Sequence, residues 1–204
     1  RDDIRSVEAC GATIFHVDVM DGMFVPTITL GLPVVRSIRK ATKLVIDCHL
    51  MIERPDRFAA EFVMAGADMV SVHVEADPHL HRTLASIREA GGQAGIAVNP
   101  ATSLSAIDEA IAFADFVLIM SVEPGFGGQA FIPTSIDKVR RLRRTIQERM
   151  LSTRIEIDGG IDADNILDIV EAGVEIVVAG SAVYGKGTAE TAVRELIKKG
   201  TVWV

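Results

Sequence analysis

Two histidines and two aspartates interrupt segments that otherwise have the apolar composition of buried strands. His16 and Asp18 stand in HVDVMDG, His49 stands in DCHLM, and Asp158 stands in IEIDGG. Alternate residues of a strand share a face, so His16 and Asp18 point to the same side. Burying an imidazole or a carboxylate without a partner costs free energy, so these side chains require polar partners. Mixed nitrogen and oxygen donors suit a divalent metal, and zinc, iron(II), manganese and cobalt all stay open.

The elements that carry these residues alternate along the chain. Short runs rich in valine and isoleucine are separated by amphipathic stretches, several of which end in glycine directly before the next run. Strands are predicted near residues 13–18, 43–49, 69–74, 93–98, 115–121, 154–158 and 175–179. Helices are predicted near residues 2–9, 32–41, 55–65, 79–90, 103–113, 134–149, 163–172 and 188–199. Strands that are apolar on both faces indicate a parallel sheet covered by helices.

The number of predicted elements favours a barrel. Eight strands and eight helices close a (β/α)8 barrel, whereas this chain opens directly in a helix and shows seven strands. We therefore expect a single α/β domain over residues 1–204, a TIM barrel whose first strand is missing from this chain. An open doubly wound sheet is the alternative, but the glycine-rich turn expected after its first strand is absent.

A barrel also places the four polar residues together, because its active site forms at the carboxyl ends of the strands. A single histidine in a strand is more often a hydrogen-bonded core residue than a ligand. Four polar residues at matching strand ends favour a shared metal and substrate site instead.

Three glycine-bearing segments follow predicted strands at the same end of the barrel. Their glycines and neighbours are Gly125, Phe126, Gly127 and Gly128 in EPGFGGQAF, Gly159 and Gly160 in DGG, and Gly180 and Ser181 in AGSA. Loops after the last two strands of a barrel commonly bind phosphate through peptide N–H groups. Neither of the last two segments contains Lys or Arg, so backbone amides and the Ser181 hydroxyl are the predicted phosphate ligands. For any single loop, glycine used only for a tight turn is the alternative.

Further residues near the strand ends have secondary roles in this prediction. Asp47 shares a face with His49 and either orients a metal ligand or supports a loop. Asp21, before Gly22, is expected to be a turn residue, and Cys48 is expected to face the outer helices. Three methionines either fill the core or line the reacting carbons of a substrate: Met20, Met51 and Met120.

The bulk composition excludes several classes of partner. The chain has 204 residues, 49% of them hydrophobic and 5% aromatic, which suits one domain with an aliphatic core. A formal charge of -7 argues against nucleic acid or an anionic membrane, and RRLRR at 140–144 is interpreted as a solvated helix face. With no apolar segment of membrane-spanning length, no recognisable signal peptide and two cysteines, the expected location is the cytoplasm.

A set of motifs stands in a fixed order between Gly11 and Tyr184. They are HVDVMDGMFVPTITLG, DCHLM, HVEA, NPATS, MSVEPGFGGQAF, EIDGGI and AGSAVYG. In this set the chain resembles the ribulose-phosphate 3-epimerase family. The resemblance implies a barrel of the ribulose-phosphate-binding type that binds one divalent metal and interconverts ribulose 5-phosphate and xylulose 5-phosphate. The family's first strand carries a PSILSADF-like segment that nothing here matches, so we expect the natural protein to have residues before Arg1.

The resemblance also implies roles for single residues. His16, Asp18, His49 and Asp158 match the metal ligands, and Asp18 and Asp158 match the acid and base. That assignment fits the chemistry, because inverting a carbon beside a ketone requires a proton to leave one face and another to reach the opposite face. The enediolate formed between these steps carries charge that a metal can stabilise. Substrate contacts are expected from His49, the three methionines and the glycine-bearing segments.

Three alternatives to this function stay open. An epimerase of the same family could act on a six-carbon ketose phosphate such as allulose 6-phosphate. A lyase or decarboxylase on a related barrel would carry an Asp-x-Lys-x-x-Asp strand, whereas here His16 and Asp18 precede Asp21 and the lysine is missing. A non-catalytic sugar-phosphate-binding relative is the third. The expected partners are a small ketose phosphate and further copies of the chain in a homo-oligomer.

Overall fold

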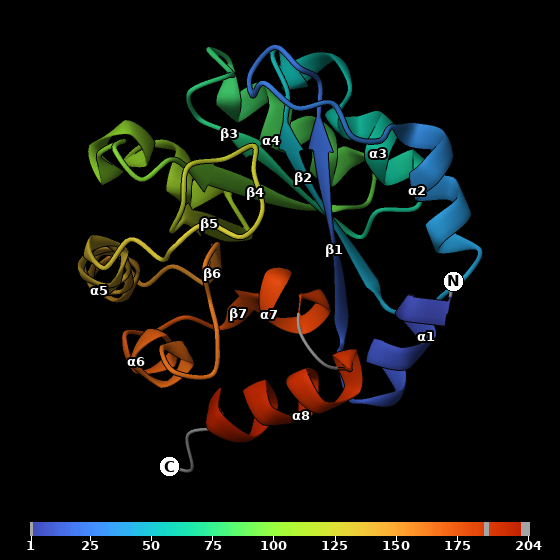
Figure 1. Cartoon of the computed structure of the whole chain (residues 1–204). Helices are drawn as coiled ribbons and strands as arrows, with labels where there is room; N and C mark the ends of the chain where they lie inside the picture. Colours follow the sequence, from blue (N-terminus) through green and yellow to red (C-terminus); the bar gives the residue numbers. More distant parts are fainter. Residues whose placement is uncertain (1, 186–187, 201–204) are drawn as a thin grey trace.

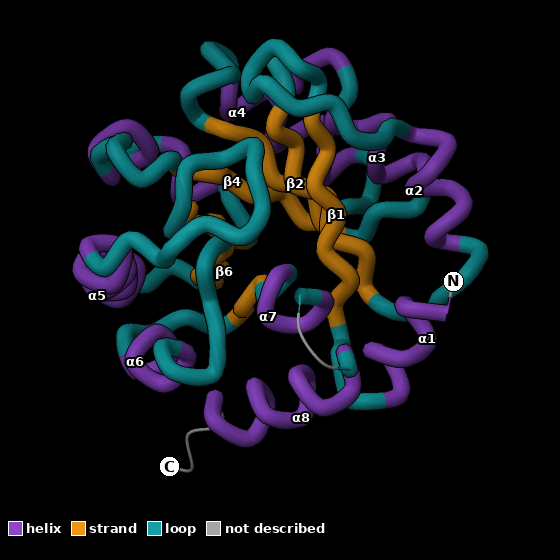
Figure 2. The backbone as a smooth tube through the Cα atoms, viewed as in Figure 1, coloured by secondary structure: helices purple, strands orange, loops and turns teal. Residues whose placement is uncertain are grey.

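The computed structural model describes residues 2–185 and 188–200, which form a parallel sheet surrounded by helices (Figures 1 and 2). The strands are β1 (Ile14–Met20), β2 (Val45–Met51), β3 (Met69–His73), β4 (Gln93–Val98), β5 (Phe116–Met120), β6 (Arg154–Asp158) and β7 (Ile176–Val178). The α-helices are α1 (Asp2–Ala9), α2 (Leu32–Arg39), α3 (Ala59–Ala65), α4 (Leu80–Glu89), α5 (Thr134–Glu148), α6 (Ile166–Glu171), α7 (Ser181–Tyr184) and α8 (Ala189–Gly200). Short 3-10 helices are η1 (Pro55–Arg57), η2 (Leu104–Ile107) and η3 (Ala110–Phe113).

The sheet is wound in chain order and confirms the α/β barrel. Its order is β1-β2-β3-β4-β5-β6-β7, and every neighbouring pair is parallel. All carboxyl ends therefore meet at one end of the barrel. Among the described residues β1 and β7 are the two edges of the sheet, and α8 passes below the opening between them to reach α1 (Figure 1). The strand expected before Arg1 is not tested by this structure and stays a prediction.

One predicted helix is wrong. The segment 103–113 forms the two short 3-10 helices η2 and η3 instead of one α-helix. The Ser103 hydroxyl accepts the backbone N–H of Ser105 at the start of the segment. Serine side chains that bond to nearby backbone groups compete with α-helical hydrogen bonds, and 3-10 turns are the usual short alternative.

Two other helices begin later than predicted, and one helix was missed. The segment predicted as a helix at 55–65 opens with the 3-10 turn η1, and its α-helix, α3, begins at Ala59. The helix predicted at 163–172 begins later, because the Asp162 carboxylate accepts the N–H groups of Asp164 and Asn165 in a turn. The four-residue helix α7 has no counterpart in the prediction. A single helical turn buries too little to leave a periodic signal in the sequence.

The core lies in two places, between the sheet and the helices and inside the barrel. Cys48 is fully buried among the outer core residues, which confirms that it faces the helices. Inside the barrel, the Phe116 ring fills the amino-terminal end, packed with Met69 and Ile176. A Cβ at Gly95 would come within 2.3 Å of that ring, so the ring fits only because residue 95 is a glycine. Within the described ranges, no helix is long and apolar enough to cross a lipid bilayer.

Candidate active site

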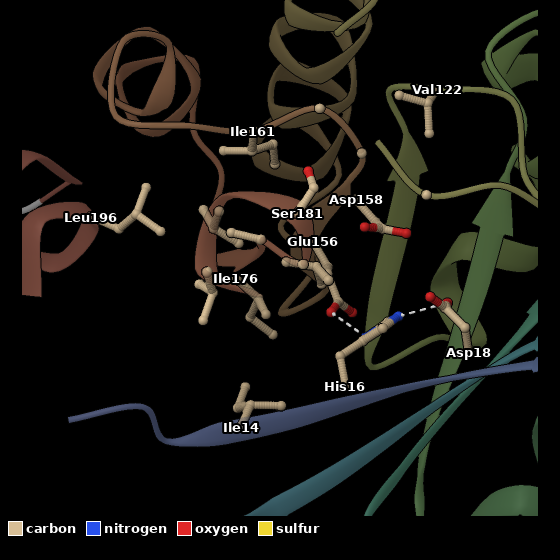
Figure 3. A pocket seen from close by; sticks show the side chains of 18 of the residues that line it. Ile14, His16, Asp18, Val122, Glu156, Asp158, Ile161, Ile176, Ser181 and Leu196 are labelled. Atoms are coloured by element: carbon tan, nitrogen blue, oxygen red, sulfur yellow. Dashed lines mark ion pairs between the residues drawn. The ribbon is translucent and has the colours of Figure 1, made fainter. Parts of the chain in front are cut away.

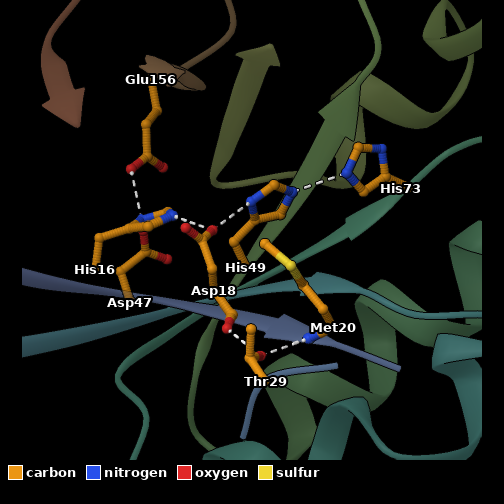
Figure 4. Close-up of polar contacts among 8 residues, drawn as sticks. All are labelled: His16, Asp18, Met20, Thr29, Asp47, His49, His73 and Glu156. Carbon is orange, nitrogen blue, oxygen red and sulfur yellow. Dashed lines mark hydrogen bonds and ion pairs between the residues drawn. The ribbon is translucent and has the colours of Figure 1, made fainter. Parts of the chain in front are cut away.

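The four predicted metal ligands meet at the carboxyl ends of β1, β2 and β6 (Figure 4 shows three of them). One ligand atom from each residue lies within 4.8 Å of the other three. Asp18 Oδ1 is 3.3 Å from His16 Nε2 and 3.2 Å from His49 Nδ1. The parallel register explains the contact, because Asp18 pairs directly with His49 across β1 and β2.

Asp47 holds the His16 ring from behind. Its Oδ2 atom lies 2.6 Å from His16 Nδ1, and the side chain is fully buried. Because Nδ1 contacts this carboxylate, Nε2 is the ring nitrogen that faces Asp18. Such carboxylate support behind a histidine ligand is common in metal sites. Of the two roles expected for Asp47, orientation of a predicted ligand is the one that its contact supports.

The donor set of the four residues fits a divalent metal. His16 Nε2 is buried and has no hydrogen-bond partner among the described residues, although it faces the Asp18 carboxylate. Two imidazole nitrogens and two carboxylates then converge on one point, a set that zinc, iron, manganese and cobalt accept. The group can therefore hold one metal ion.

The two aspartates of the group differ in acidity. Burial raises the pKa of Asp158 to about 7, and the charge of His16 only partly offsets this. Burial also acts on Asp18, but the nearby His16 and the hydrogen bond with His49 outweigh it and hold the pKa of Asp18 far below its ordinary value. Near neutral pH the residues of the site thus favour one ionised and one protonated aspartate. Carboxyl groups with separated pKa values are suited to act as base and acid.

The pKa values of the two histidines are shifted in opposite directions. Burial lowers the pKa of His49 to about 4, and the hydrogen bond to Asp18 offsets only part of this. Burial would also lower the pKa of His16, but the negative charge and hydrogen bond of Asp47, with the carboxyl groups of Asp18 and Glu156 close by, raise it well above its ordinary value. His49 is therefore the neutral imidazole of the pair.

Glu156 belongs to the site, and the sequence analysis missed it. It lies on β6 two residues before Asp158 and is fully buried, with Oε1 3.7 Å from His16 Nδ1 (Figure 4). Neither carboxyl oxygen has a hydrogen-bond partner among the described residues. Burial and the neighbouring Asp47 raise its pKa well above the ordinary value. The alternation in IEID, which puts Glu156 and Asp158 on one face, was the available signal.

His73 and Glu75 were also missed, although HVEA was among the recognised motifs. His73 Nε2 lies 2.8 Å from His49 Nε2, and its Nδ1 lies 3.1 Å from Glu75 Oε2. His73 is fully buried at the end of β3. His49 therefore has a polar partner on each side of its ring.

The glycine-bearing segments line one cavity together with His16, Asp18 and Asp158 (Figure 3). The cavity has a volume of about 610 Å³. Predicted substrate residues on its walls are Met20, Met51, Met120, Gly125, Phe126, Gly127, Gly128, Gly159, Gly160, Gly180 and Ser181. His49, also expected to touch substrate, is fully buried and is not among the residues that line the cavity. The cavity continues between β1 and β7, where Ile14, Ile176 and Leu196 make its wall apolar (Figure 3).

The loop after β6 depends on its glycines. Gly159 and Gly160 have φ angles of 119° and 65°, which favour glycine. A Cβ at Gly160 would lie 2.5 Å from the backbone nitrogen of Phe131. The Ser121 hydroxyl donates to the carbonyl oxygens of Asp158 and Gly159, at 2.9 and 2.7 Å. These contacts fix the backbone immediately after Asp158.

Two loops at the carboxyl ends of the strands are joined by a hydrogen bond. The expected turn role of Asp21 is confirmed, because its carboxylate accepts the N–H groups of Met23, Phe24 and Glu53. Further along the same loop, Thr27 donates to the carbonyl oxygen of Gly125, at 2.9 Å. The loop after β1 is thereby joined to the glycine-bearing loop after β5.

A parallel α/β barrel with histidine and aspartate side chains that can hold a metal at the carboxyl ends of its strands has the architecture of a barrel enzyme. The chain matches the model of the ribulose-phosphate 3-epimerase family over residues 1–184. It is 50% identical over 195 residues to ribulose-phosphate 3-epimerase of Aquifex aeolicus, covering 96% of this chain and 88% of that protein. The Bacillus subtilis ribulose-phosphate 3-epimerase is 46% identical over 195 residues, with coverage of 95% and 90%. The chain belongs to the ribulose-phosphate 3-epimerase family and is an isomerase.

Solved structures agree on the fold. The 3-hexulose-6-phosphate synthase from Salmonella typhimurium superposes with a TM-score of 0.72 at 20% identity, covering 98% of this chain and 90% of that one. KGPDC from Streptococcus mutans, in complex with D-R5P, gives a TM-score of 0.76 at 13% identity, covering 97% and 89%. At these identities the likeness shows the barrel fold alone.

Proposed function

We propose that the site inverts C3 of D-ribulose 5-phosphate to give D-xylulose 5-phosphate, with one divalent metal held by His16, Asp18, His49 and Asp158. The observation that carries the proposal is the convergence of their four ligand atoms within 4.8 Å, beside the cavity that the glycine-bearing loops line. Close identity to ribulose-phosphate 3-epimerases supports the same substrate. When bound, the metal would stabilise negative charge on the ketone and hydroxyl oxygens of the substrate.

Asp18 and Asp158 exchange the protons. Asp18 takes the C3 proton from one face of the sugar. Asp158 returns a proton to the opposite face. The two residues come from β1 and β6, on different walls of the barrel (Figure 3), so they can reach the carbon from different sides. In the reverse direction their roles exchange.

The phosphate group rests on backbone amides of Gly159, Gly160, Gly180 and Ser181. Both loops line the cavity, and α7 begins at Ser181 directly after the second of them. Oriented N–H groups can bind a phosphate without a cationic side chain. Met20, Met51 and Met120 supply an adaptable apolar surface for the carbon chain.

We also propose a cytoplasmic, homo-oligomeric enzyme. Cys10 and Cys48 are both free and buried, which suits a reducing compartment. Size-exclusion chromatography with light scattering measures the oligomeric state directly.

The test removes and restores the metal. Protein is treated with a chelator, assayed with D-ribulose 5-phosphate, and reloaded with zinc, iron(II), manganese or cobalt, while bound metal is counted. The expected result is activity lost on removal and regained in proportion to one metal ion per chain. Full activity in protein shown to be free of metal would contradict the proposal. If a six-carbon ketose phosphate is turned over faster, the proposed substrate is wrong and the proposed mechanism stands.

A further inference from the structure

The main chain of Asp18 is held by the hydroxyl group of Thr29, a residue of the loop after β1. This hydroxyl donates to the carbonyl oxygen of Asp18 at 2.8 Å and accepts the backbone N–H of Met20 at 3.0 Å (Figure 4). The backbone N–H of Thr29 also donates to the carbonyl oxygen of Met20, at 3.1 Å. Three hydrogen bonds therefore join one loop residue to the end of the strand that carries Asp18.

These hydrogen bonds lie on the edge of β1 that faces away from β2. The backbone groups of successive residues in a strand point to alternate edges. The carbonyl oxygen of Thr13, just before β1, accepts the N–H of Val45 from β2, so Asp18 and Met20, an odd number of residues further on, present theirs to the other edge. Among the described residues β1 is an edge strand, so Thr29 supplies hydrogen bonds that a neighbouring strand would otherwise supply.

The main chain of Asp158 has a similar partner in Ser121, directly after β5. The backbone N–H of Ser121 donates to the carbonyl oxygen of Asp158 at 2.8 Å. The Ser121 hydroxyl lies 2.9 Å from the same oxygen and 2.7 Å from the carbonyl oxygen of Gly159, and the two oxygens share its single proton. Ser121 is fully buried, whereas Thr29 is exposed. A hydrogen bond lost from a buried group costs more, so the larger effect is expected at Ser121.

Both hydroxyl groups lie behind the residues that face the substrate cavity. Asp18 and Asp158 line the cavity, whereas Thr29 and Ser121 are not among its lining residues. A side chain moves with its own main chain, and displacing a reacting group by about 1 Å can cost about 100-fold in rate. The two hydroxyl groups can therefore act on the reaction through the positions of the two aspartates.

We propose that Thr29 and Ser121 are positioning residues that hold Asp18 and Asp158 where each can exchange a proton with C3 from its own side. The proposal rests on the proposed function for the roles of the two aspartates, and on backbone hydrogen bonds alone for its geometry. Thr29 acts on the proton transfer made by Asp18, and Ser121 acts on the transfer made by Asp158. The two residues should therefore have distinguishable effects on the reaction.

Two variants remove one hydroxyl group each, and two controls remove a comparable hydroxyl group elsewhere. Thr29→Val and Ser121→Ala are the test variants, and Thr29→Ser keeps the hydroxyl group. Thr145→Val is the control for Thr29, because the Thr145 hydroxyl also lies at the surface and donates to a carbonyl oxygen of its own helix, α5. Thr153→Val is the control for Ser121, because the Thr153 hydroxyl is buried and contacts two backbone carbonyl oxygens, just before β6.

The readout is the primary isotope effect on kcat/KM with substrate that carries deuterium at C3. In the proposed reaction Asp18 takes this hydrogen from D-ribulose 5-phosphate, and Asp158 takes it from D-xylulose 5-phosphate. When transfer to one aspartate slows, that step limits more of the overall rate. The isotope effect then rises for the epimer that gives its hydrogen to this aspartate and falls for the other epimer. A general loss of stability does not produce such opposite shifts.

The expected shifts are opposite in the two test variants, with every protein saturated with metal and its Tm measured. Thr29→Val should lower kcat/KM about 3- to 10-fold and raise the isotope effect for D-ribulose 5-phosphate. Ser121→Ala should lower kcat/KM about 10- to 100-fold and raise the isotope effect for D-xylulose 5-phosphate. Thr29→Ser should restore the wild-type values, and both controls should keep the wild-type isotope effects even where their Tm falls.

Wild-type isotope effects in a folded Thr29→Val variant overturn the proposal, and so do shifts in the same direction in both test variants. Thr29 is exposed, so this variant decides the matter even if Ser121→Ala does not fold. If the wild-type enzyme turns over neither epimer, or its product retains the substrate's deuterium, the proposed function fails and the positioning role falls with it. A wild type that behaves as expected beside unresponsive variants confines the failure to the positioning role.

Discussion

The two sides of the barrel mouth use different parts of the chain for their chemistry. On the β1–β2 side, polar side chains converge, and buried groups such as Asp47 and His73 lie behind them. In the loops after β6 and β7, glycine backbone lines the cavity and no charged side chain stands between Gly159 and Ile161 or between Gly180 and Val183. The first side can handle protons and a metal, and the second can bind an anion at uncharged amides. Substitutions should therefore act on the two sides by different routes.

The largest effect is expected at the two aspartates. Asp18→Asn and Asp158→Asn keep the side-chain shape but cannot accept and return a proton, so kcat should fall about 10²- to 10⁴-fold. Because both residues are also predicted ligands, the metal content of each variant is measured beside its activity. A variant that keeps its metal and its wild-type kcat would remove that aspartate from the acid and base pair.

Substitutions of the two buried carboxyl groups beside His16 should have different effects on metal affinity. Asp47→Asn weakens the 2.6 Å contact that orients His16, so metal affinity should fall about 10- to 100-fold. Glu156 has a pKa well above its ordinary value, so it is already neutral and Glu156→Gln should change metal affinity little. Competition with a coloured chelator measures both. Equal losses in the two variants would mean that Glu156 supports His16 as a carboxylate.

Metal affinity should depend on pH through Asp158 and His16. The pKa of Asp158 is raised to about 7, so in protein stripped of metal its proton persists as pH rises from 4 to 7 and must leave when a metal binds. Apparent affinity should therefore rise with pH over this window, about tenfold per unit for each proton displaced, and the raised pKa of His16 adds to the slope. Asp158→Asn should flatten the slope, while the exposed Asp137→Asn should not.

On the glycine side, backbone shape is the target. Gly160→Ala puts a Cβ 2.5 Å from the Phe131 nitrogen at a φ of 65°, so the loop must move at a cost of about 1–3 kcal/mol. The expected result is a lower Tm and a higher KM with less change in kcat. Gly31→Ala is the control, because Gly31 lacks a positive φ and its Cβ would meet its nearest neighbour at 4.0 Å. An unchanged KM in the Gly160→Ala variant would mean that the phosphate does not bind at this loop.

The sequence analysis correctly predicted the positions that follow from strand periodicity. His16, Asp18, His49 and Asp158 came together because parallel strands align their carboxyl ends, and residues two apart share a face. The predicted strand ends were less accurate, because the strand predicted to end at His49 continues two residues further, to Met51.

Residues that depend on partners could not be assigned. Glu156 and His73 meet their partners, His16 and His49, across strands, and a single sequence does not say which buried polar groups meet. The helix predicted at 103–113 failed for a local reason, because Ser103 bonds to the backbone of its own turn. Periodicity therefore located the predicted ligands but not the buried residues that contact them.

The most direct test of the central claim follows hydrogen at C3 during turnover in heavy water. If Asp18 and Asp158 act from opposite faces, the acid that returns the proton is not the base that removed it. Product formed from either epimer by metal-loaded enzyme should then carry solvent deuterium at C3, seen by NMR or mass spectrometry. Product that retains the substrate's own hydrogen at C3, with metal bound, would contradict the two-base account and indicate a single base or a redox route.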